Sequence, residues 1–523
     1  MIEKDSSGPG NLTRFLVILS SFCLLDLLSL PIFLSYDLWV FADRSNFLNL
    51  DHLLANHLRL GVDAFYSYGL LPVLIQHVLF AWFGRGYWPL VGCTIVVVIF
   101  LALFWSLLVG YLSNRWSYLL AVVVISPILL WINPNFPYSL VQLSMLFALL
   151  FLLKGRADIA LALSVIGCFS VPSLPLLLTG LLGLYIVADW WCNTDRQIGL
   201  LMRRLTPGIG TCVVLFAVLS AFFGFRSTLV TALPILGLKF YYGSGKMDFT
   251  DLMKFILPAG HSFKYYVAYY IGTPAGWWIL CTIALLVLGA VSAGVMLRNR
   301  KPDPRHAAVL FCALLQAFFV IVAYRGDQQH VLYDPITAAG MFVAISIFPV
   351  VRWRNLVLAL FVCTGVLGQA FEARHTLWAW KNTHPSPLTA NLYAEPEYGP
   401  EMANVLKLAA THKVLIVSHA SGVYNYYPPT RPIDSWYVMP PLMSRMDEDR
   451  VLEDIKNADV VVEDTTHIPW FVERNPRATS VLHSMCLTDI SHNFQIWWWH
   501  PSESAVCKPN PIPASGGIPS AVR

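Results

Sequence analysis

The chain has 523 residues, of which 56% are hydrophobic and only 13% are charged, and its mean hydropathy is +0.59. An average soluble domain carries about 25% charged residues, so this composition excludes a chain built of soluble domains alone. The formal net charge is only +4, and the basic residues stand in short clusters beside apolar segments, not on one face interleaved with aromatics, which argues against nucleic acid as a partner.

Apolar segments long enough to cross a membrane all lie between residues 1 and 372, and the remainder reads as a polar domain. Hydropathy in windows of about 19 residues predicts about eleven spans. They lie at about 14–35, 88–111, 116–132, 137–153, 157–171, 173–190, 207–224, 275–297, 306–323, 335–350 and 354–371. The predicted fold class is an all-α polytopic membrane domain over residues 1–372, followed by a small α/β domain.

The stretch at 68–83, YGLLPVLIQHVLFAWF, is apolar enough for one more span. Hydropathy therefore does not tell whether it crosses the membrane, and the distribution of charge is used instead. Short cytoplasmic loops carry an excess of Lys and Arg. If 68–83 is an interfacial helix, every predicted cytoplasmic segment is basic, and together these segments hold Lys4, Arg14, Arg115, Lys154, Arg156, Arg196, Arg203, Arg204, Arg298, Arg300, Lys301, Arg305, Arg352 and Arg354. We therefore expect a surface helix at 68–83, a cytoplasmic N-terminus, an uncleaved first segment and an extracytoplasmic C-terminal domain.

This topology leaves three long segments outside, at residues 36–87, 225–274 and about 372–523. The second is rich in tyrosine, which suits an aromatic belt at the membrane surface. In the third, a Pro-rich linker precedes a predicted helix (EMANVLKLAATH), strand (KVLIVSH), helix (DEDRVLEDIKNA) and strand (DVVVEDT), a small α/β pattern assigned to residues 373–508. Residues 509–523 are rich in Pro, Gly and Ser and are predicted to be disordered.

Of the 10 cysteines, only Cys486 and Cys507 fall in the polar C-terminal region. The others lie in or beside apolar segments, where cysteine behaves as a small hydrophobic residue. If the C-terminal domain faces an oxidising compartment, Cys486 and Cys507 can form a disulfide. Sequence alone fixes no geometry, so two free thiols remain the alternative.

Ionisable side chains are densest in the first outer segment, and such groups at a membrane surface are functional candidates. The segment holds Asp37, Asp43, Arg44, Asp51, His52, His57, Arg59 and Asp63. Asp51 also has a structural interpretation, because Asn49-Leu50-Asp51 before an apolar run is a helix N-cap signal. His52 and His57 miss the i, i+4 spacing of paired ligands on a helix, so we predict no metal site and no cofactor, with a divalent metal left open.

The order of motifs along the chain resembles the integral-membrane glycosyltransferases of the GT-C fold, which include the protein O-mannosyltransferases and the lipid A aminoarabinose transferases. After the first span and a loop acid come G-x-x-x-x-Y-x-Y-G-x-L-P at 61–72 and Phe83-Gly84. The late segment YRGDQQHVLYDP at 324–335 is similar to an outer loop of those enzymes. The tail, with VLIVSHASGVYNYYPPTRPIDSWYVMP and then LEDIKNADVVVEDT, resembles their outer domain.

This resemblance implies transfer of a sugar, with inversion, from a polyprenyl-phosphate carrier to a glycan, lipid or protein acceptor at the extracytoplasmic face. A carboxylate acts as general base on the acceptor hydroxyl, and basic residues stabilise the departing lipid phosphate. Matching the loop acid makes Asp51 the base and Asp63 a second catalytic contact, with Asp37 and Asp43 as rivals and further substrate contacts. Many relatives carry Asp-Glu where this chain has Asp51-His52.

The same resemblance assigns the remaining substrate contacts. In the first outer segment these are His52, Arg59, Tyr66 and Tyr68; in the second, Lys254, His261 and Lys264; in the third, Arg325, His330 and Tyr333. Arg325 and His330 are expected at the phosphate, with the second group as helpers. For Arg325 the alternative is a solvated residue snorkelling at a helix end.

Two other classes of membrane protein share parts of this pattern. A transporter also has many spans, but we find no internal repeat and few ionisable residues within the predicted spans, chiefly Asp26 and Asp158. A lipid-linked glycan polymerase or ligase would carry its active loop between late spans. The resemblance favours a protein of the bacterial inner membrane with a periplasmic C-terminal domain, and it leaves the sugar, the acceptor and the oligomeric state undetermined.

Overall fold

The computed structural model describes most of the chain, in segments separated by gaps. The described residues are 8–34, 48, 50–51, 54–55, 57, 59–62, 66, 68–113, 115–129, 136–192, 197–233, 257, 262–320, 335–386, 392–394, 396, 398–417, 445–464, 476–491, 494–501 and 506–509.

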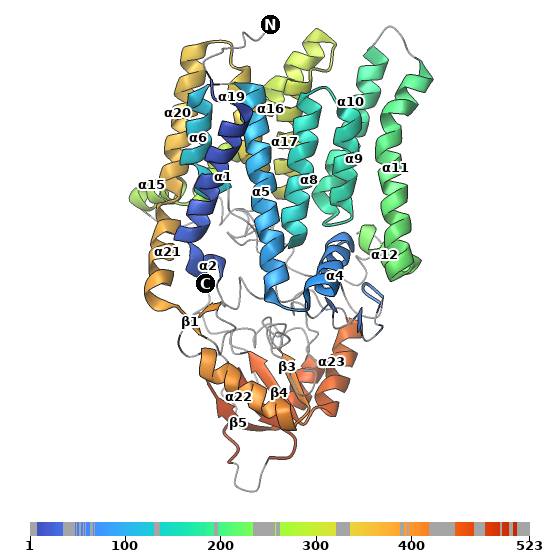
Figure 1. Ribbon diagram of the computed structural model, residues 1–523, viewed down its shortest axis with the longest axis vertical. Helices are drawn as coiled ribbons and strands as arrows, with labels where there is room; N and C mark the ends of the chain where they lie inside the picture. The colour runs from blue at the N-terminus through green and yellow to red at the C-terminus, as the bar shows by residue number, and fades with distance from the viewer. Residues whose placement is uncertain are drawn as a thin grey trace.

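The first part of the chain is a bundle of roughly parallel and antiparallel helices (Figure 1). Its longer helices are α1 (Asn11–Leu28), α5 (Tyr87–Leu112), α8 (Phe136–Leu153), α10 (Ser173–Cys192), α11 (Ile198–Phe223), α16 (Pro274–Asn299) and α20 (Val351–Gly368). The shorter ones are α2 (Leu30–Phe33), α4 (Leu71–Phe83), α6 (Trp116–Val124), α7 (Ser126–Leu129), α9 (Ala157–Cys168), α12 (Phe225–Ala232), α15 (Phe263–Gly272), α17 (Pro304–Phe318), α19 (Pro335–Ile347) and α21 (Ala370–Asn382).

Each predicted span coincides with one helix or with a consecutive pair, namely α1 with α2 and α6 with α7. Within the described residues, 6 helices are long and apolar enough to cross a membrane, and shorter apolar helices of 10–17 residues lie among them. α11 begins at Ile198, well before the predicted span at 207–224, because Pro207 is accommodated inside the helix. The polytopic helical class predicted from hydropathy is therefore confirmed.

Aromatic side chains are buried between the helices of the bundle, and many large apolar side chains face outward. Trp105 of α5 contacts Phe342 of α19, with ring centroids 5.5 Å apart, and Phe342 in turn contacts Phe361 of α20. Large apolar side chains such as Leu184 and Val213 are exposed on the outer surface. An apolar exterior of this kind is stable only against lipid, which agrees with a membrane domain.

The C-terminal domain lies at one end of the bundle and the N-terminus lies at the other (Figure 1). α21 ties the domain to the first helix, because Trp380 donates a hydrogen bond from Nε1 to the Leu28 carbonyl at 2.6 Å. The backbone N–H of Tyr393 donates to the Leu34 carbonyl at 2.9 Å. The predicted topology requires this opposition of N-terminus and domain, while the assignment of one end to the cytoplasm stays a prediction.

The C-terminal domain is a small α/β unit. Its elements are the ribbon of β1 (His384–Ser386) and β2 (Leu392–Ala394), α22 (Tyr398–Thr411), β3 (Val414–Val417), α23 (Arg445–Asn457), β4 (Val460–Asp464), α25 (Pro476–Leu482), β5 (Cys486–Ile490) and β6 (Phe494–Trp498). The sheet has the order β3-β4-β6-β5, with β3 parallel to β4 and the other neighbours antiparallel. The alternation of helices and strands expected up to β4 is present, and the sheet also contains the unpredicted pair β5 and β6.

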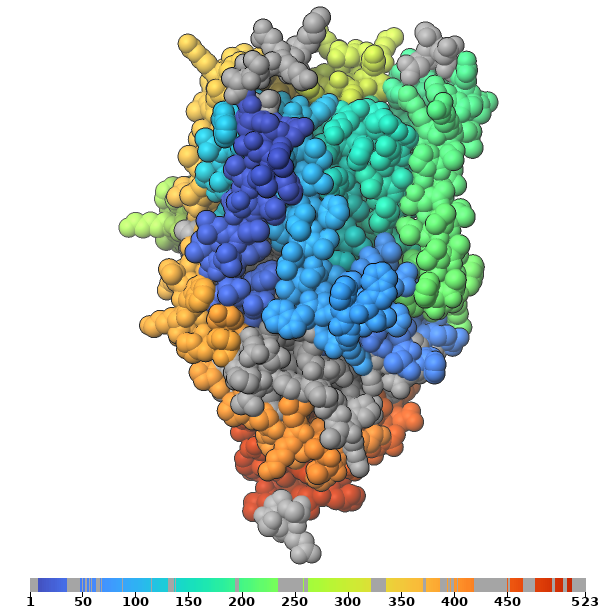
Figure 2. Space-filling view, viewed as in Figure 1, coloured from blue at the N-terminus to red at the C-terminus, as the bar shows by residue number. Residues whose placement is uncertain are grey.

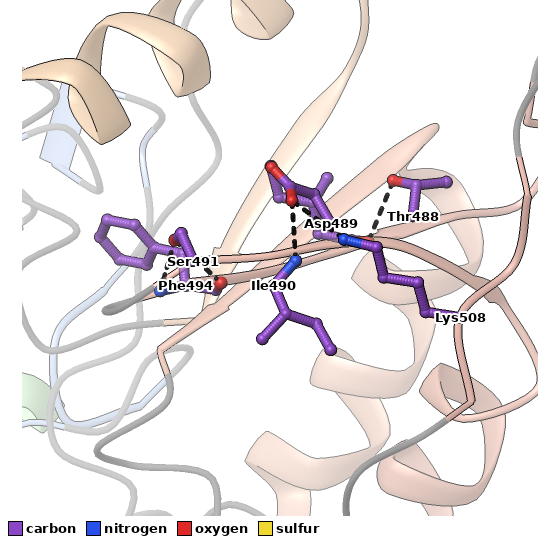
Figure 3. Close-up of polar contacts among 7 residues, drawn as sticks. Thr488, Asp489, Ile490, Ser491, Phe494 and Lys508 are labelled. Carbon is purple, nitrogen blue, oxygen red and sulfur yellow. Dashed lines mark hydrogen bonds and ion pairs between the residues drawn. The ribbon is translucent and has the colours of Figure 1, made fainter.

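The last described residues are held against β5 by a disulfide, a backbone hydrogen bond and an ion pair. Cys486 and Cys507 form a disulfide, with Cα atoms 5.2 Å apart. Lys508 donates from its backbone N–H to the Leu487 carbonyl at 2.7 Å, and its Nζ lies 3.3 Å from Asp489 Oδ1 (Figure 3). Ser491 and Phe494 close the turn from β5 to β6 through two hydrogen bonds in the same view. Residues 510–523, most of the predicted tail, lie outside the described residues.

Candidate functional site

The first outer segment is organised around helix α4, at the end of the bundle that faces the C-terminal domain (Figure 1). α4 begins with Pro72 in its first turn and buries Pro72, Val73, Gln76 and Phe80 along one face. At 1.5 Å per residue its 13 residues span about 20 Å, whereas a bilayer core is about 30 Å thick. α4 is shorter than a bilayer core, but α9 and α19 are equally short, so length does not separate a span from the interfacial helix predicted from charge, which stays a prediction.

The carboxylate of Asp51 lies against the exposed flank of α4, between two basic side chains. Its Oδ1 is 2.8 Å from His77 Nδ1, and its Oδ2 is 3.3 Å from Arg85 Nε. Because an ionised carboxylate only accepts hydrogen bonds, Nδ1 of His77 is the protonated donor in this pair. The Asp51 side chain is 15% exposed, against 48% for His77 and 31% for Arg85, so the carboxylate is the most enclosed of the three.

Arg85 links the Asp51 carboxylate to the backbone of Leu48. It stands between Gly84 and Gly86 at the turn from α4 to α5, and its Nη2 donates to the Leu48 carbonyl. Burial lowers the pKa of the Arg85 guanidinium, and the charge of Asp51 opposes that shift. An arginine remains protonated at any physiological pH, so the cluster carries a fixed positive charge beside the carboxylate.

Asp51 is not a helix N-cap. Leu48 and Leu50 are already helical, as is Asp51 itself, whereas an N-cap residue has non-helical backbone angles. Its carboxylate is occupied by His77 and Arg85 instead of by backbone amides. The capping interpretation is therefore wrong, and Asp51 is placed by contacts with α4 and the turn that follows it.

Two glycines of the 61–72 motif, Gly61 and Gly69, allow the backbone conformation and the close packing of the chain that leads into α4. The Gly69 N–H donates to the Ser170 carbonyl at 2.6 Å, and the Leu71 N–H donates to the Phe169 carbonyl at 3.1 Å, so the entry to α4 is paired with the turn between α9 and α10. A Cβ at Gly69 would lie 2.0 Å from the Phe169 oxygen. Gly61 has a φ of +75°, a left-handed conformation that favours glycine.

Tyr66 and Tyr68, both predicted substrate contacts, are buried in the apolar cluster beneath α4. Their rings meet edge to face at 5.7 Å, and Tyr68 meets Tyr138 of α8 in the same way at 5.5 Å. The Tyr66 hydroxyl is buried and has no hydrogen-bond partner among the described residues, and burial raises the pKa of this phenol. These rings support the scaffold of the site, while a contact with substrate stays a prediction.

The structure describes two other predicted contacts, Arg59 and Lys264. Arg59 is exposed next to the buried Leu60. Lys264 is exposed on α15, which projects from the flank of the bundle (Figure 2) and packs against α16 and α20. α4 packs instead against α5 and α8, so within the described residues Lys264 and Asp51 are not brought together.

The remaining predicted residues fall outside the described part of the chain. They are Asp37, Asp43, His52, Asp63, Lys254, His261, Arg325, His330 and Tyr333. Within the part that the structure describes, no three His, Cys, Asp or Glu side chains converge as metal ligands would.

His77 and Arg85 were not predicted as site residues. His77 is the one ionisable residue within the apolar stretch 68–83, and Arg85 stands in the short loop between two apolar helices. Ionisable residues at a membrane surface are functional candidates by default, and that signal identifies both. What the sequence does not show is that both face Asp51.

Comparisons with known proteins find a likeness among solved structures. No family model matches the chain, and no curated protein matches it. Among solved structures, the chain is similar to ArnT from Cupriavidus metallidurans, in a crystal structure with bound undecaprenyl phosphate, at 12% sequence identity and a TM-score of 0.44. The match covers 92% of this chain and 98% of that one. A likeness at this level assigns no activity.

Proposed function

We propose that this chain is a membrane glycosyltransferase that moves a sugar from a polyprenyl-phosphate carrier to an acceptor hydroxyl on the side of the membrane where the C-terminal domain lies. The observation that carries the proposal is the Asp51 carboxylate held between His77 of α4 and Arg85 of the turn that follows it. A carboxylate and a fixed cation are the two groups that such a transfer needs, and the motif order of the chain supports the same reaction.

Asp51 is proposed as the general base. Its Oδ1 and Oδ2 each use one contact, and a carboxylate has about four acceptor positions, so room remains for an acceptor hydroxyl. As the acceptor oxygen attacks the anomeric carbon, its proton passes to Asp51, and the bond from that carbon to the phosphate oxygen breaks with inversion. The polyprenyl phosphate leaves with the bonding electron pair.

Arg85 is proposed to stabilise the negative charge that develops on the departing phosphate. A guanidinium matches phosphate geometry with several parallel donors, and Arg85 uses Nε and Nη2 in the contacts described above, which leaves other N–H groups for a ligand. His77 is proposed to orient the carboxylate. The sugar, the acceptor and the remaining predicted contacts, including Asp63, Arg325 and His330, belong to the same proposal.

The location of α4 supports a lipid-linked donor. Its last turn exposes Trp82 and Phe83, and aromatic residues of this kind concentrate where membrane meets water. The phosphate of a polyprenyl carrier lies at that same depth, because its chain is confined to the hydrocarbon. A base on α4's flank is therefore at the height where the reacting bond would be.

The test is an assay of polyprenyl phosphate release from polyprenyl-phosphate sugars by the purified protein in lipid nanodiscs. Asp51→Asn should lower the rate about 10²–10⁴-fold while the protein still folds, because it removes only the proton acceptor. Asp158→Asn, at the far end of the bundle, is the matched control and should retain the wild-type rate. An active Asp51→Asn variant would refute Asp51 as the base.

His77 is the alternative base, since Asp51 could orient the imidazole in the way a carboxylate orients a catalytic histidine. His77→Gln keeps one hydrogen-bonding side chain and removes a titratable group. If Asp51 is the base, this variant keeps a measurable rate whose dependence on pH above neutrality follows the wild type. A loss as deep as that of Asp51→Asn would transfer the role to His77. Substrate uptake into proteoliposomes without sugar release would instead indicate a transporter.

A further inference from the structure

At the end of the bundle opposite Asp51, the polar groups that are buried without a hydrogen-bond partner among the described residues include one in α6 and one in α20. One is the hydroxyl of Tyr118 in α6, a residue only 1% exposed. The other is Nε of Arg354 in the first turn of α20. A buried donor left unpaired is destabilising, and more so when it is charged, so a ligand that accepts hydrogen bonds would satisfy both groups.

The two groups belong to one place in the fold. α6 packs against α20, and both begin at the end of the bundle that carries the N-terminus (Figure 1). The Tyr118 ring lies 6.2 Å from the ring of Phe342, which also contacts Phe361 of α20. Arg115 directly precedes α6, three residues before Tyr118, and Arg354 lies in the first turn of α20. Tyr118, Arg354 and Arg115 are called the α6/α20 cluster below.

The cluster is positive, with no acidic residue in the first turn of α6 or of α20. α6 begins directly after Arg115, so the positive end of its helix dipole adds to the two guanidinium groups. Tyr118 contributes an O–H donor. Guanidinium groups and a phenol match the oxygens of a phosphate, to which arginine donates several parallel hydrogen bonds.

The depth of the cluster identifies the source of that phosphate. Trp116, next to Arg115, is 50% exposed, and Trp353, next to Arg354, is 60% exposed. Exposed tryptophans mark the level of lipid headgroups, and basic pockets between membrane helices on the predicted cytoplasmic side bind anionic headgroups. A phospholipid can reach this position laterally from its own leaflet.

We propose that the α6/α20 cluster is a binding site for a phosphate group, occupied by the headgroup of an anionic phospholipid in the leaflet opposite the Asp51 site. The lipid would lie with its phosphate against Arg354 and Tyr118 and its acyl chains along the apolar faces of α6 and α20. This site is separate from the proposed carrier site, because the two are at opposite ends of the bundle.

The experiment measures lipid retained by the full-length protein, by native mass spectrometry and by thermal unfolding in nanodiscs of phosphatidylcholine with increasing phosphatidylglycerol. Arg354→Gln should weaken phosphatidylglycerol binding about fivefold or more, since one basic residue contributes about 1 kcal/mol at a membrane surface. Tyr118→Phe, which keeps the ring and removes the donor, should weaken it by a similar factor. Arg352→Gln makes the same change of charge on the exposed side of α20 and should change binding less than twofold.

Inorganic phosphate added to phosphatidylcholine nanodiscs separates the two sources of the ligand. Stabilisation by phosphatidylglycerol alone supports the headgroup. Equal stabilisation by inorganic phosphate, lost in Arg354→Gln, supports the site with a soluble phosphate as occupant. Equal lipid binding by wild type, Tyr118→Phe and Arg354→Gln would overturn the proposal, and Tyr118→Phe keeps the test decisive if Arg354→Gln fails to fold.

Discussion

Arg85 joins Asp51 to the backbone of Leu48, and its replacement should separate catalysis from folding. Arg85→Gln should lower kcat for polyprenyl phosphate release about 10²–10³-fold, as expected when one donor to developing charge is removed. Arg85→Lys keeps the charge without the planar fork and should recover part of that loss. Arg156→Gln, at the other end of the bundle, serves as the control; a wild-type kcat in Arg85→Gln would remove Arg85 from the mechanism.

Gly69 is the residue whose smallness the fold requires most directly. In Gly69→Ala the new Cβ would lie 2.0 Å from the Phe169 carbonyl oxygen, so the entry to α4 has to move. We expect a loss of about 1–3 kcal/mol in stability and a lower rate of sugar transfer. Gly92→Ala in α5 meets nothing within 4 Å and should be neutral or slightly stabilising. Thermal unfolding of both variants in nanodiscs checks this.

Asp51 and its partners show which part of the candidate site the sequence alone predicts. Asp51 could be selected because it is an acid in an outer loop. Its partners could not, since His77 lies 26 positions later and the contact depends on how the helical residues Leu48, Leu50 and Asp51 pack against α4. That placement follows from tertiary packing of Leu48 and Leu50 beneath α4, which no local pattern encodes.

Helices and strands differ in how well local pattern predicts them. The spans follow from hydropathy because a bilayer demands long apolar helices. β5 and β6, which are no shorter than the predicted β3 and β4, were missed because a register irregularity between Leu487 and Asp489 interrupts the alternation of buried and exposed residues on which strand prediction depends. Their place in the sheet is set by pairing with β4.

The predicted location of α4 at the membrane surface can be tested by labelling an engineered cysteine. A cysteine at Val62, beside Gly61, should react with a membrane-impermeant maleimide from the side of the C-terminal domain only. Lys301→Cys, in the predicted cytoplasmic turn between α16 and α17, should react from the other side only. Reaction of Val62→Cys from the cytoplasm would place the first outer segment on the wrong face and exclude the proposed reaction there.

The stability of the whole C-terminal domain should depend on pH through His483. Its ring stacks on Trp497 at 5.3 Å, and burial lowers its pKa from the ordinary value of 6.5. The unfolded state then binds the proton more tightly than the folded state, so this contribution is complete above pH 6.5 and is lost as the pH falls through the folded pKa. Trp fluorescence during unfolding should show a smaller loss at pH 5 to 6 in His483→Phe. Identical pH profiles would contradict this.

The disulfide gives a second prediction at the scale of the domain. Cys486 and Cys507 close a loop of 21 residues, and cross-links of about this length stabilise by about 3 kcal/mol. The double variant Cys486→Ser with Cys507→Ser should therefore lower the unfolding temperature of the domain and detach the segment at Lys508 from β5. Unchanged protease sensitivity of that segment would show that the disulfide is not what holds it.

The hydrogen bond from Trp380 to Leu28 joins positions 352 residues apart. During translation the first helix enters the membrane long before α21 has left the ribosome. The Leu28 carbonyl therefore has no hydrogen bond from Trp380 until synthesis is nearly complete. A nascent chain arrested after α20 would therefore lack the hydrogen bond between α21 and the first helix. This bond would form only after the last segments are released.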